Sequence, residues 1–390
     1  MNRVWRLHRN NLLIFMAIFM LTLLLCSPSI IFAKVTGQCS NCHTMHNSQN
    51  GSNVNMYGAT GQPWKGSGPF PALVRGDCLG CHGMGTAENI DSVIGAPQVF
   101  HTDTTDLAGG NFAYILGVKG SGASDAKGHN VIDLGDIDDI LEGPPGAFLG
   151  ADHDEVVTNY ELTCAGDGGC HGARCPNCGK SNLLALRGAH HGDVEGKITV
   201  ADNAANSYRF LWGVKGLEDS DWQATTSSTD HNEYYGAVSP PLYDYSSCNV
   251  CHTPASVVAP QNTISGFCGT CHGNLHTLSG GYYGNGAGIG DDVNSPFQRH
   301  PTDIVLPATG EYSAYTSYSL EAPVARTSVL DNPSNTVTPG DDIVICLSCH
   351  RAHATDYPDM LRWDYNAMIA NGGSNTTGCF TCHTTKDVMP

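Results

Sequence analysis

The chain has 390 residues and a formal net charge of −18, with 19 basic against 37 acidic side chains. Such acidity disfavours nucleic acid and anionic lipid as partners and favours cationic partners or metal ions, although it also suits a protein that only needs to stay soluble after export. Glycine (46) and proline (20) are abundant, and long apolar runs are few. This composition argues against a conventional core of long helices or extended sheets.

Residues 1–33 have the pattern of an export signal. Arg3, Arg6 and Arg9 precede an apolar run from Leu12 to Cys26, and Ala33 ends a candidate cleavage site. We expect cleavage there, which leaves a more acidic mature chain. Two alternatives stay open: an uncleaved membrane anchor, and a lipid-modified Cys26, although the preceding Leu25 is not a small residue.

After the signal, the chain repeats the motif Cys-x-x-Cys-His six times. The copies are Cys39, Cys42 and His43; Cys78, Cys81 and His82; Cys248, Cys251 and His252; Cys268, Cys271 and His272; Cys346, Cys349 and His350; and Cys379, Cys382 and His383. Two thiols one short turn apart bond to the vinyl groups of a haem, and the next residue places an imidazole on the iron. Zinc knuckles or disulfides do not require a histidine after every second cysteine. The repeats therefore predict covalently bound haem c.

An irregular cysteine group lies in the middle of the chain, with Cys164, Cys170 and His171 followed by Cys175 and Cys178. In one interpretation the first three residues attach a seventh haem through a wide Gly-rich loop, and the last two cysteines form a disulfide. In the other, the four cysteines hold a structural zinc and His171 is incidental. We favour haem, because the Cys-His ending is retained and glycines let a wide loop fold back.

The motif spacing divides the mature chain into three modules. Residues 34–145 form an N-terminal module with two haems, 146–240 a middle module with the irregular cysteines, and 241–390 a C-terminal module with four haems; Gly-Pro-rich and Ser-Pro-Pro segments mark the joints. Each macrocycle supplies apolar bulk that short turns of chain can wrap. We therefore expect mostly irregular coil with short α-helices around a chain of covalently bound haems, and little β-structure.

Further histidines offer each iron a second axial ligand. His46, His276 and His353 follow three attachment histidines by three or four residues, a spacing that predicts adjacent turns of a short helix. Two imidazoles on one helix cannot reach opposite faces of one haem, so each of these three should ligate a neighbouring haem. The remaining candidates are His129, His153, His190, His191, His231 and His300, with only one of the adjacent pair His190 and His191 expected to bind. His101 is the weakest candidate, and its alternative interpretation is a surface residue.

Imidazole on both faces leaves no open iron position, which suits electron transfer rather than catalysis. We therefore predict no catalytic residue. A multihaem reductase of a nitrogen or sulfur oxyanion, with one open haem, is the competing hypothesis, and a zinc-stabilised scaffold protein is a third. Because His43 lies near the mature N-terminus and His383 near Pro390, haems are expected at both chain ends. This placement suggests end-to-end electron exchange, including assembly into a filament.

The passages Cys39–His46, Cys346–His353 and Cys379–His383 resemble the doubled Cys-x-x-Cys-His multihaem cytochromes of metal-respiring and related anaerobic bacteria. The resemblance implies an exported bis-His electron carrier of periplasmic or extracellular respiration, whose partners are other redox proteins or metal-ion and mineral acceptors. It also implies that Cys164 to His171 is a wide-loop haem attachment. Some related multihaem cytochromes assemble into conducting filaments, so the resemblance makes self-assembly a further expectation. The pair Cys175 and Cys178 departs from the pattern and leaves the local haem number open.

Overall fold

The computed structural model describes a discontinuous part of the chain. The described residues are 38–53, 56–57, 62–63, 73–75, 78–84, 87–134, 144–145, 162–165, 169–171, 213–216, 229–237, 263–269, 271–272, 275, 300, 302–371 and 376–386. They belong to the second of two units into which the chain divides, 1–33 and 34–390.

Several predicted features lie outside the described residues. These are the export signal, the whole third motif, the last two middle cysteines and four candidate second ligands: Cys248, Cys251, His252, Cys175, Cys178, His153, His190, His191 and His276. The assignment of Cys251 to a thioether bond and of His252 to an iron is therefore still a prediction from the sequence.

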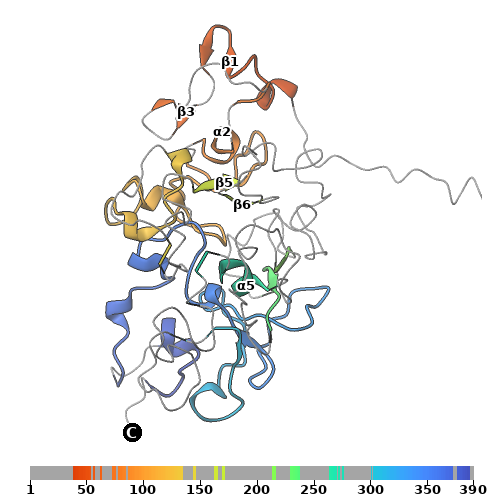
Figure 1. The fold of residues 1–390 in the computed structure, drawn as a ribbon, viewed down its shortest axis with the longest axis vertical. Helices are drawn as coiled ribbons and strands as arrows, with labels where there is room; N and C mark the ends of the chain where they lie inside the picture. The colour runs from red at the N-terminus through yellow and green to blue at the C-terminus, as the bar shows by residue number, and fades with distance from the viewer. Residues whose placement is uncertain are drawn as a thin grey trace, which may run out of the picture. The chain divides into compact units, whose positions relative to one another are not determined.

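Among the described residues the helices are all short, and most are of the 3-10 type (Figure 1). Two described helices are α-helical, α2 (Leu79–His82) and α5 (Ile264–Gly269). The 3-10 helices are η1 (Cys39–Asn41), η2 (Phe112–Tyr114), η3 (Asp125–Lys127), η4 (Ile132–Leu134), η7 (Gly310–Tyr312), η8 (Cys346–Ser348), η9 (Pro358–Met360), η10 (Tyr365–Ala367) and η11 (Gly378–Thr381).

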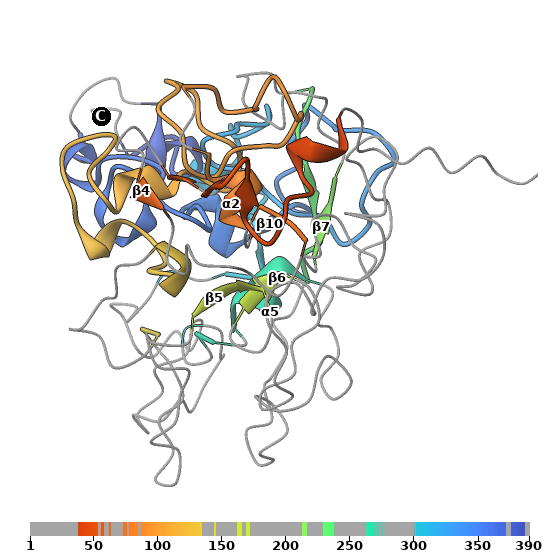
Figure 2. The ribbon, with the colours of Figure 1, turned by 90° about the horizontal axis from the view of Figure 1, so that it is seen from above.

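The strands form separate two-stranded ladders, seen from above in Figure 2. Antiparallel pairs join β1 (Ser48–Gln49) to β2 (Ser52–Asn53), β3 (Met56–Tyr57) to β4 (Gln62–Pro63), β7 (Val214–Lys215) to β8 (Glu233–Tyr234), and β9 (Ile304–Val305) to β10 (Ile343–Val344). A parallel pair joins β5 (Thr163–Ala165) to β6 (Gly169–His171), which closes the wide loop between Cys164 and Cys170.

The cysteine motifs themselves fold as single helical turns. The amide of the attachment histidine donates to the carbonyl of the first cysteine in each described regular motif, at 2.7 Å from His43 to Cys39, 2.9 Å from His82 to Cys78, and 3.0 Å in the three motifs that end at His272, His350 and His383. This turn brings residues three positions apart to one side of the chain. It therefore presents both thiols of a motif together, as attachment to one macrocycle requires.

The fourth motif continues the turn beyond the end of an α-helix. Cys268 belongs to α5, which ends at Gly269, and Cys271 follows that end. The amide of Cys271 still donates to the carbonyl of Cys268, at 3.1 Å. Neither cysteine forms a disulfide. Cys271 is therefore positioned beside Cys268 as the thioether prediction requires, although the bond itself stays a prediction.

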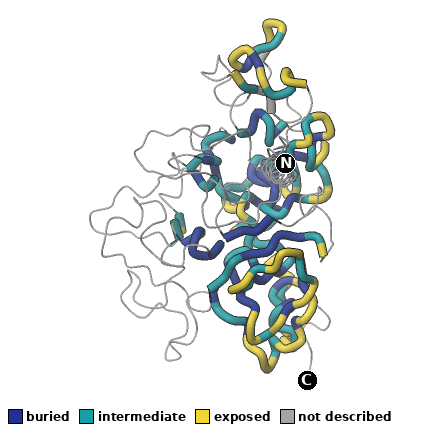
Figure 3. The backbone as a smooth tube through the Cα atoms, turned by 90° about the vertical axis from the view of Figure 1, so that its right-hand side faces the viewer, coloured by how far each residue is buried: buried dark blue, intermediate teal, exposed yellow. Residues whose placement is uncertain are grey.

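Within the described residues, buried apolar side chains gather in three small clusters. One surrounds Phe100, Phe112 and Ile115, a second Ile264, Phe267 and Ile343, and a third Leu306, Tyr318 and Val324. Attachment cysteines border them, with Cys164 at the first, Cys170 at the second and Cys382 at the third. Figure 3 shows the buried stretches of the described backbone in dark blue.

The predicted fold class is confirmed in its architecture, because the described residues are mostly irregular with short helices and little β-structure. The helical spacing argument is wrong for His46 and His353. His46 has φ +57° and Asn47 φ +70°, which ends any helix after η1, and residues 350–353 are not helical either. The three-module division stays a prediction, while the ion pair of Lys127 with Asp356 joins its first segment to its third.

No helix in the described ranges has both the length and the apolar character that a membrane crossing requires.

Candidate haem-attachment sites

The attachment histidines are oriented by hydrogen bonds at one ring nitrogen. Nδ1 lies at a backbone carbonyl oxygen in four of them: His43 at Leu73 (3.2 Å), His82 at Pro97 (2.8 Å), His272 at Pro145 (2.7 Å) and His350 at Asp359 (2.7 Å). A carbonyl accepts only, so Nδ1 carries the proton and Nε2 keeps its lone pair. This is the arrangement by which metal-ligating histidines are held in other metal sites.

The carbonyl facing His350 is presented by a backbone turn that L-residues rarely adopt. Asp359 and the following Met360 have φ of 60° and 57°. The turn is held in place by the attachment motif itself, because the amide of Arg351 donates to the carbonyl of Met360 at 3.0 Å. Strain of this kind persists only where surrounding contacts enforce it. Here the contacts aim one carbonyl at the histidine ring.

Three attachment histidines face a second imidazole. The ring centroids are 6.0 Å apart for His272 and His129, 6.2 Å for His171 and His353, and 6.1 Å for His383 and His300. A metal–imidazole bond is about 2 Å long and the centroid lies about 1 Å beyond the nitrogen, so two imidazoles on opposite faces of one iron have centroids roughly 6 Å apart. All three pairs have the separation that a shared iron needs.

The imidazoles of the first pair are neutral, as iron ligands must be. Burial lowers the pKa of His272, and the hydrogen bond to Pro145 only partly opposes this. Burial also lowers the pKa of His129, whose Nδ1 lies 2.6 Å from the carbonyl oxygen of Ala352. Burial has the same effect on the pKa of His350.

The cysteines of neighbouring motifs lie close together. Burial, followed by the nearby Cys42 thiol, raises the pKa of Cys81 to about 11. Burial, followed by the nearby Cys382 and Cys379 thiols, raises the pKa of Cys349 to about 12. With haem attached these sulfur atoms are thioethers, so the shifts matter here because they show proximity. The first two motifs form one neighbouring pair and the last two form another.

The described attachment cysteines occur in pairs, and each pair is followed by a histidine. No cysteine in the described ranges forms a disulfide. Within the same residues, no group of three or more His, Cys, Asp or Glu side chains is arranged to hold a metal ion directly. The part of the zinc interpretation that involves Cys175 and Cys178 lies outside them. Thiols in pairs, each followed by an oriented imidazole, match covalent haem attachment.

The interpretation of His101 as a surface residue is wrong. Its side chain is 0% exposed, neither ring nitrogen has a hydrogen-bond partner, and the Asp106 carboxylate is 3.9 Å away. Burial lowers the pKa of His101 to about 4, so the ring is neutral. A buried neutral imidazole of this kind is a better ligand candidate than the sequence suggested, and its apolar neighbours Val99 and Phe100 were the available signal.

Two further predicted axial ligands, His231 and His46, differ in exposure. His231 is fully buried, with Nδ1 2.8 Å from the carbonyl oxygen of Asn232, Nε2 3.1 Å from that of Ser334, and its ring stacked on Tyr318 at 3.7 Å. Ligation by His231 would need another side-chain position. His46 lies exposed beyond the first motif. Both stay predictions, as do the four candidates outside the described residues.

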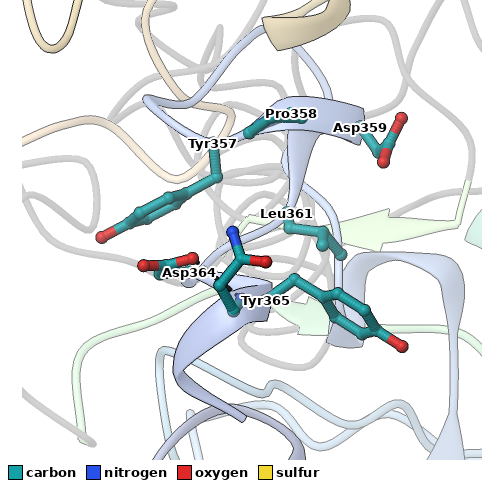
Figure 4. A pocket seen from close by; sticks show the side chains of 7 residues that line it. Tyr357, Pro358, Asp359, Leu361, Asp364 and Tyr365 are labelled. Atoms are coloured by element: carbon teal, nitrogen blue, oxygen red, sulfur yellow. Dashed lines mark hydrogen bonds between the residues drawn. The ribbon is translucent and has the colours of Figure 1, made fainter.

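A pocket of about 150 Å³ lies behind the Asp359 turn (Figure 4). Its lining comes from Tyr357, Pro358, Asp359, Leu361, Asp364, Tyr365 and Asn366. Cofactor pockets usually exceed about 300 Å³, so this one is too small for a macrocycle. It is best understood as the outer side of the turn that holds His350.

Comparison with known proteins agrees with the motif chemistry. A family model described as "Doubled CXXCH motif" matches residues 337–388. The C-type cytochrome OmcS of Geobacter sulfurreducens is 28% identical over an alignment of 392 positions that covers 87% of this chain and 82% of that protein.

Two solved structures are also similar. The outer membrane cytochrome S filament of Geobacter sulfurreducens has a TM-score of 0.40 at 20% identity, covering 92% of this chain and 93% of that one. The cryo-EM structure of OmcS nanowires from the same organism has a TM-score of 0.42 at 19% identity, covering 89% and 88%.

Proposed function

We propose that this chain, a multihaem c-type cytochrome of the doubled CXXCH family, carries electrons outside the cytoplasm through six or seven bis-His haems. One observation carries the proposal. A second imidazole lies opposite each of His272, His171 and His383, with ring centroids 6.0–6.2 Å apart. Haem c, when bound, supplies one-electron chemistry between ferric and ferrous iron. Imidazole on both faces leaves no position for a substrate.

The residues of the chain have holding and orienting roles. Cysteines fix each macrocycle by thioether bonds, and the attachment histidine takes one face of the iron. Among the candidates for the second face, we assign His129 to the haem of Cys268 and Cys271, and His300 to the haem of Cys379 and Cys382. The third motif, with Cys251 and His252, is assigned a haem on its sequence alone. Candidates for the other irons are His46, His101, His153, His190, His191, His231 and His276.

A seventh haem at Cys164, Cys170 and His171 is part of this proposal. The parallel ladder of β5 and β6 brings the two ends of the wide loop together, and His353 faces His171. Zinc binding by the four middle cysteines would assign no role to the facing imidazoles of His171 and His353. We therefore favour haem over zinc at this position.

Electron transfer between haems is supported by the pairing of the motifs. Cys42 neighbours Cys81, and Cys349 neighbours Cys382, so the macrocycles they hold would lie in adjacent pairs. His353 belongs to the segment that follows one motif and faces the attachment histidine of another. Such sharing holds neighbouring haems close, and closeness is what a conducting chain of haems needs.

Location and partners follow from the export pattern and the attachment chemistry. A signal of this kind and covalently attached haem are typical of the periplasm or the cell exterior. We propose other redox proteins or metal-ion and mineral acceptors as partners. Because attachment motifs stand near both ends of the mature chain, end-to-end self-assembly into a filament is one proposed mode of use.

Intact-mass measurement of the native protein tests the haem assignment. We expect the mass of seven haems and cleavage after Ala33. A double Cys164→Ser, Cys170→Ser variant should lose one haem, whereas the matched Cys175→Ser, Cys178→Ser variant should lose none. If both variants keep the haem mass and lose zinc, the middle group is a zinc site and the number of haems is six.

The third motif is tested by the same measurement. A double Cys248→Ser, Cys251→Ser variant is expected to lose the mass of one haem, because both thioether bonds of that macrocycle are removed. An unchanged mass would show that Cys251 and His252 do not attach haem.

Electron paramagnetic resonance separates the carrier from the competing reductase. We expect only low-spin ferric signals in intact protein, because every iron carries two imidazoles. A high-spin signal together with turnover of nitrite, sulfite or a related oxyanion would overturn the carrier function. For assembly, images of concentrated native protein that show only discrete particles would exclude the filament.

A further inference from the structure

The last attachment histidine differs from those of the other four described regular motifs in the group that lies at its Nδ1. The carboxylate oxygen Oε1 of Glu311 lies 3.2 Å from Nδ1 of His383, where the other described regular motifs have a neutral backbone carbonyl. The Glu311 side chain is 17% exposed and that of His383 is 28% exposed, so water screens this contact only in part.

The position of Glu311 is determined by several contacts from both sides. The short helix η7 begins at Gly310, whose φ of +71° makes the turn into it. The backbone carbonyl of Glu311 accepts hydrogen bonds from both the amide and the hydroxyl of Thr384, next to the attachment histidine. The ring of Tyr312 lies 5.2 Å from that of His383. These contacts hold the Glu311 carboxylate beside His383.

The carboxylate is ionised at neutral pH. The ordinary pKa of a glutamate carboxyl is about 4.3, well below neutral pH, and the cation of Lys386 lies beside Glu311. Lys386 Nζ stands 3.5 Å from the other oxygen, and its side chain is 58% exposed. The lysine charge is therefore well hydrated and offsets the carboxylate only weakly.

We infer that Glu311 is a positioning residue that gives the haem of Cys379, Cys382 and His383 a lower reduction potential than haems whose attachment histidines bond to carbonyl groups. The inference rests on the proposed function, since it requires haem at this motif. A carboxylate partner makes a ligating imidazole more basic, and a more basic ligand stabilises ferric over ferrous iron. The haem nearest the C-terminus would therefore give up its electron before those haems.

The test is a spectroelectrochemical titration of the full-length, haem-loaded Glu311→Gln variant. Glutamine keeps the size and an accepting oxygen but removes the charge. We expect the reduction potential of one haem to rise by about 59 mV, which is a roughly tenfold change in the ferric–ferrous equilibrium of a one-electron couple. In the titration, the part of the absorbance change that belongs to this haem should move to higher potential. Glu311→Asp, which retains a carboxylate, should restore part of the difference.

Two further variants make the sign and the location testable. Glu88→Gln removes the same charge from an exposed carboxylate that accepts the Ser92 amide, and it should leave the titration unchanged. Lys386→Gln removes the nearby cation and should move the same haem to lower potential.

An equal shift in Glu88→Gln and Glu311→Gln, or no shift in Glu311→Gln with haem mass and low-spin spectra intact, would overturn the inference. Failure of the proposed function gives a different result: a double Cys379→Ser, Cys382→Ser variant with the same haem mass as the native protein would mean that no haem is attached there.

Discussion

The imidazole of His353 faces that of His171, with ring centroids 6.2 Å apart and planes at 48°. His353 is held there by its own backbone, whose amide donates to Gly109 at 2.7 Å and whose carbonyl accepts the His129 amide at 3.0 Å. The ring of Phe112 stacks on it at 4.8 Å. Segments from three distant parts of the sequence therefore build one axial position.

His353→Ala is expected to leave one iron with a single imidazole. The physical reason is that alanine removes the second ligand while the attachment through Cys164 and Cys170 remains. Electron paramagnetic resonance should then show one new high-spin ferric signal with an unchanged haem mass. The matched variant Phe112→Leu removes the stacked ring but no ligand, and it should stay low-spin. Entirely low-spin spectra for His353→Ala would contradict the assignment.

His101→Phe is expected to convert one further haem to a high-spin form. Phenylalanine keeps an aromatic ring in the buried site but has no nitrogen to bind iron. If His101 were only a packing residue, the variant would keep every haem low-spin. The same spectra, compared with those of His231→Phe, decide which of these two buried histidines is a ligand.

Gly110→Ala is expected to destabilise the contact between residues 107–111 and 353–355. Gly110 has φ +90°, and a Cβ there would overlap the carbonyl group of Ala354. Left-handed strain and the overlap together should cost about 3 kcal/mol or more. Gly95→Ala is the matched control, because Gly95 has φ +66° with open space around it, and it should cost about 1 kcal/mol. Thermal unfolding midpoints by circular dichroism compare the two.

Asp356→Asn is expected to weaken the protein at neutral pH and to flatten its acid unfolding. Asp356 Oδ1 accepts from Lys127 Nζ at 2.9 Å and from the amide and hydroxyl of Ser121 at 2.7 and 2.9 Å. Partial burial would raise its pKa, but these hydrogen bonds lower it below the usual Asp range. The stabilisation is therefore fully present above the unfolded-state pKa of about 4 and is lost as pH falls through the lowered pKa.

The measurement is denaturant unfolding of native and Asp356→Asn protein across this pH range. The difference should be about 1 kcal/mol at neutral pH, since water screens a side chain that is 33% exposed, and it should close in acid. Asp331→Asn is the control, because Asp331 also pairs with a buried lysine, Lys215, at 3.0 Å, but its side chain is 96% exposed. A comparable loss in that variant would assign the effect to charge in general.

The sequence predicted the structure within each attachment motif, but it did not predict which distant segments of the chain lie close together. The turn at Cys346–His350 follows from the motif itself, because its hydrogen bonds run between residues three and four apart. Helical continuation from His43 to His46 was wrong because His46 and Asn47 adopt left-handed backbone, which no spacing argument anticipates. The burial of His101 was likewise missed, because burial depends on what packs over a residue from elsewhere.

The sequence by itself determined which residues are candidates to attach haem, because the cysteine-histidine motifs are local. It also indicated that the described residues would form short elements, because glycine and proline are abundant. Only the tertiary structure decided which imidazole faces which, as with His353 and His171, and that a carboxylate rather than a carbonyl holds His383. The reason is physical: axial pairing and the contacts of each ligand's second nitrogen depend on through-space distances between chain segments, and those are set by packing rather than by position along the chain.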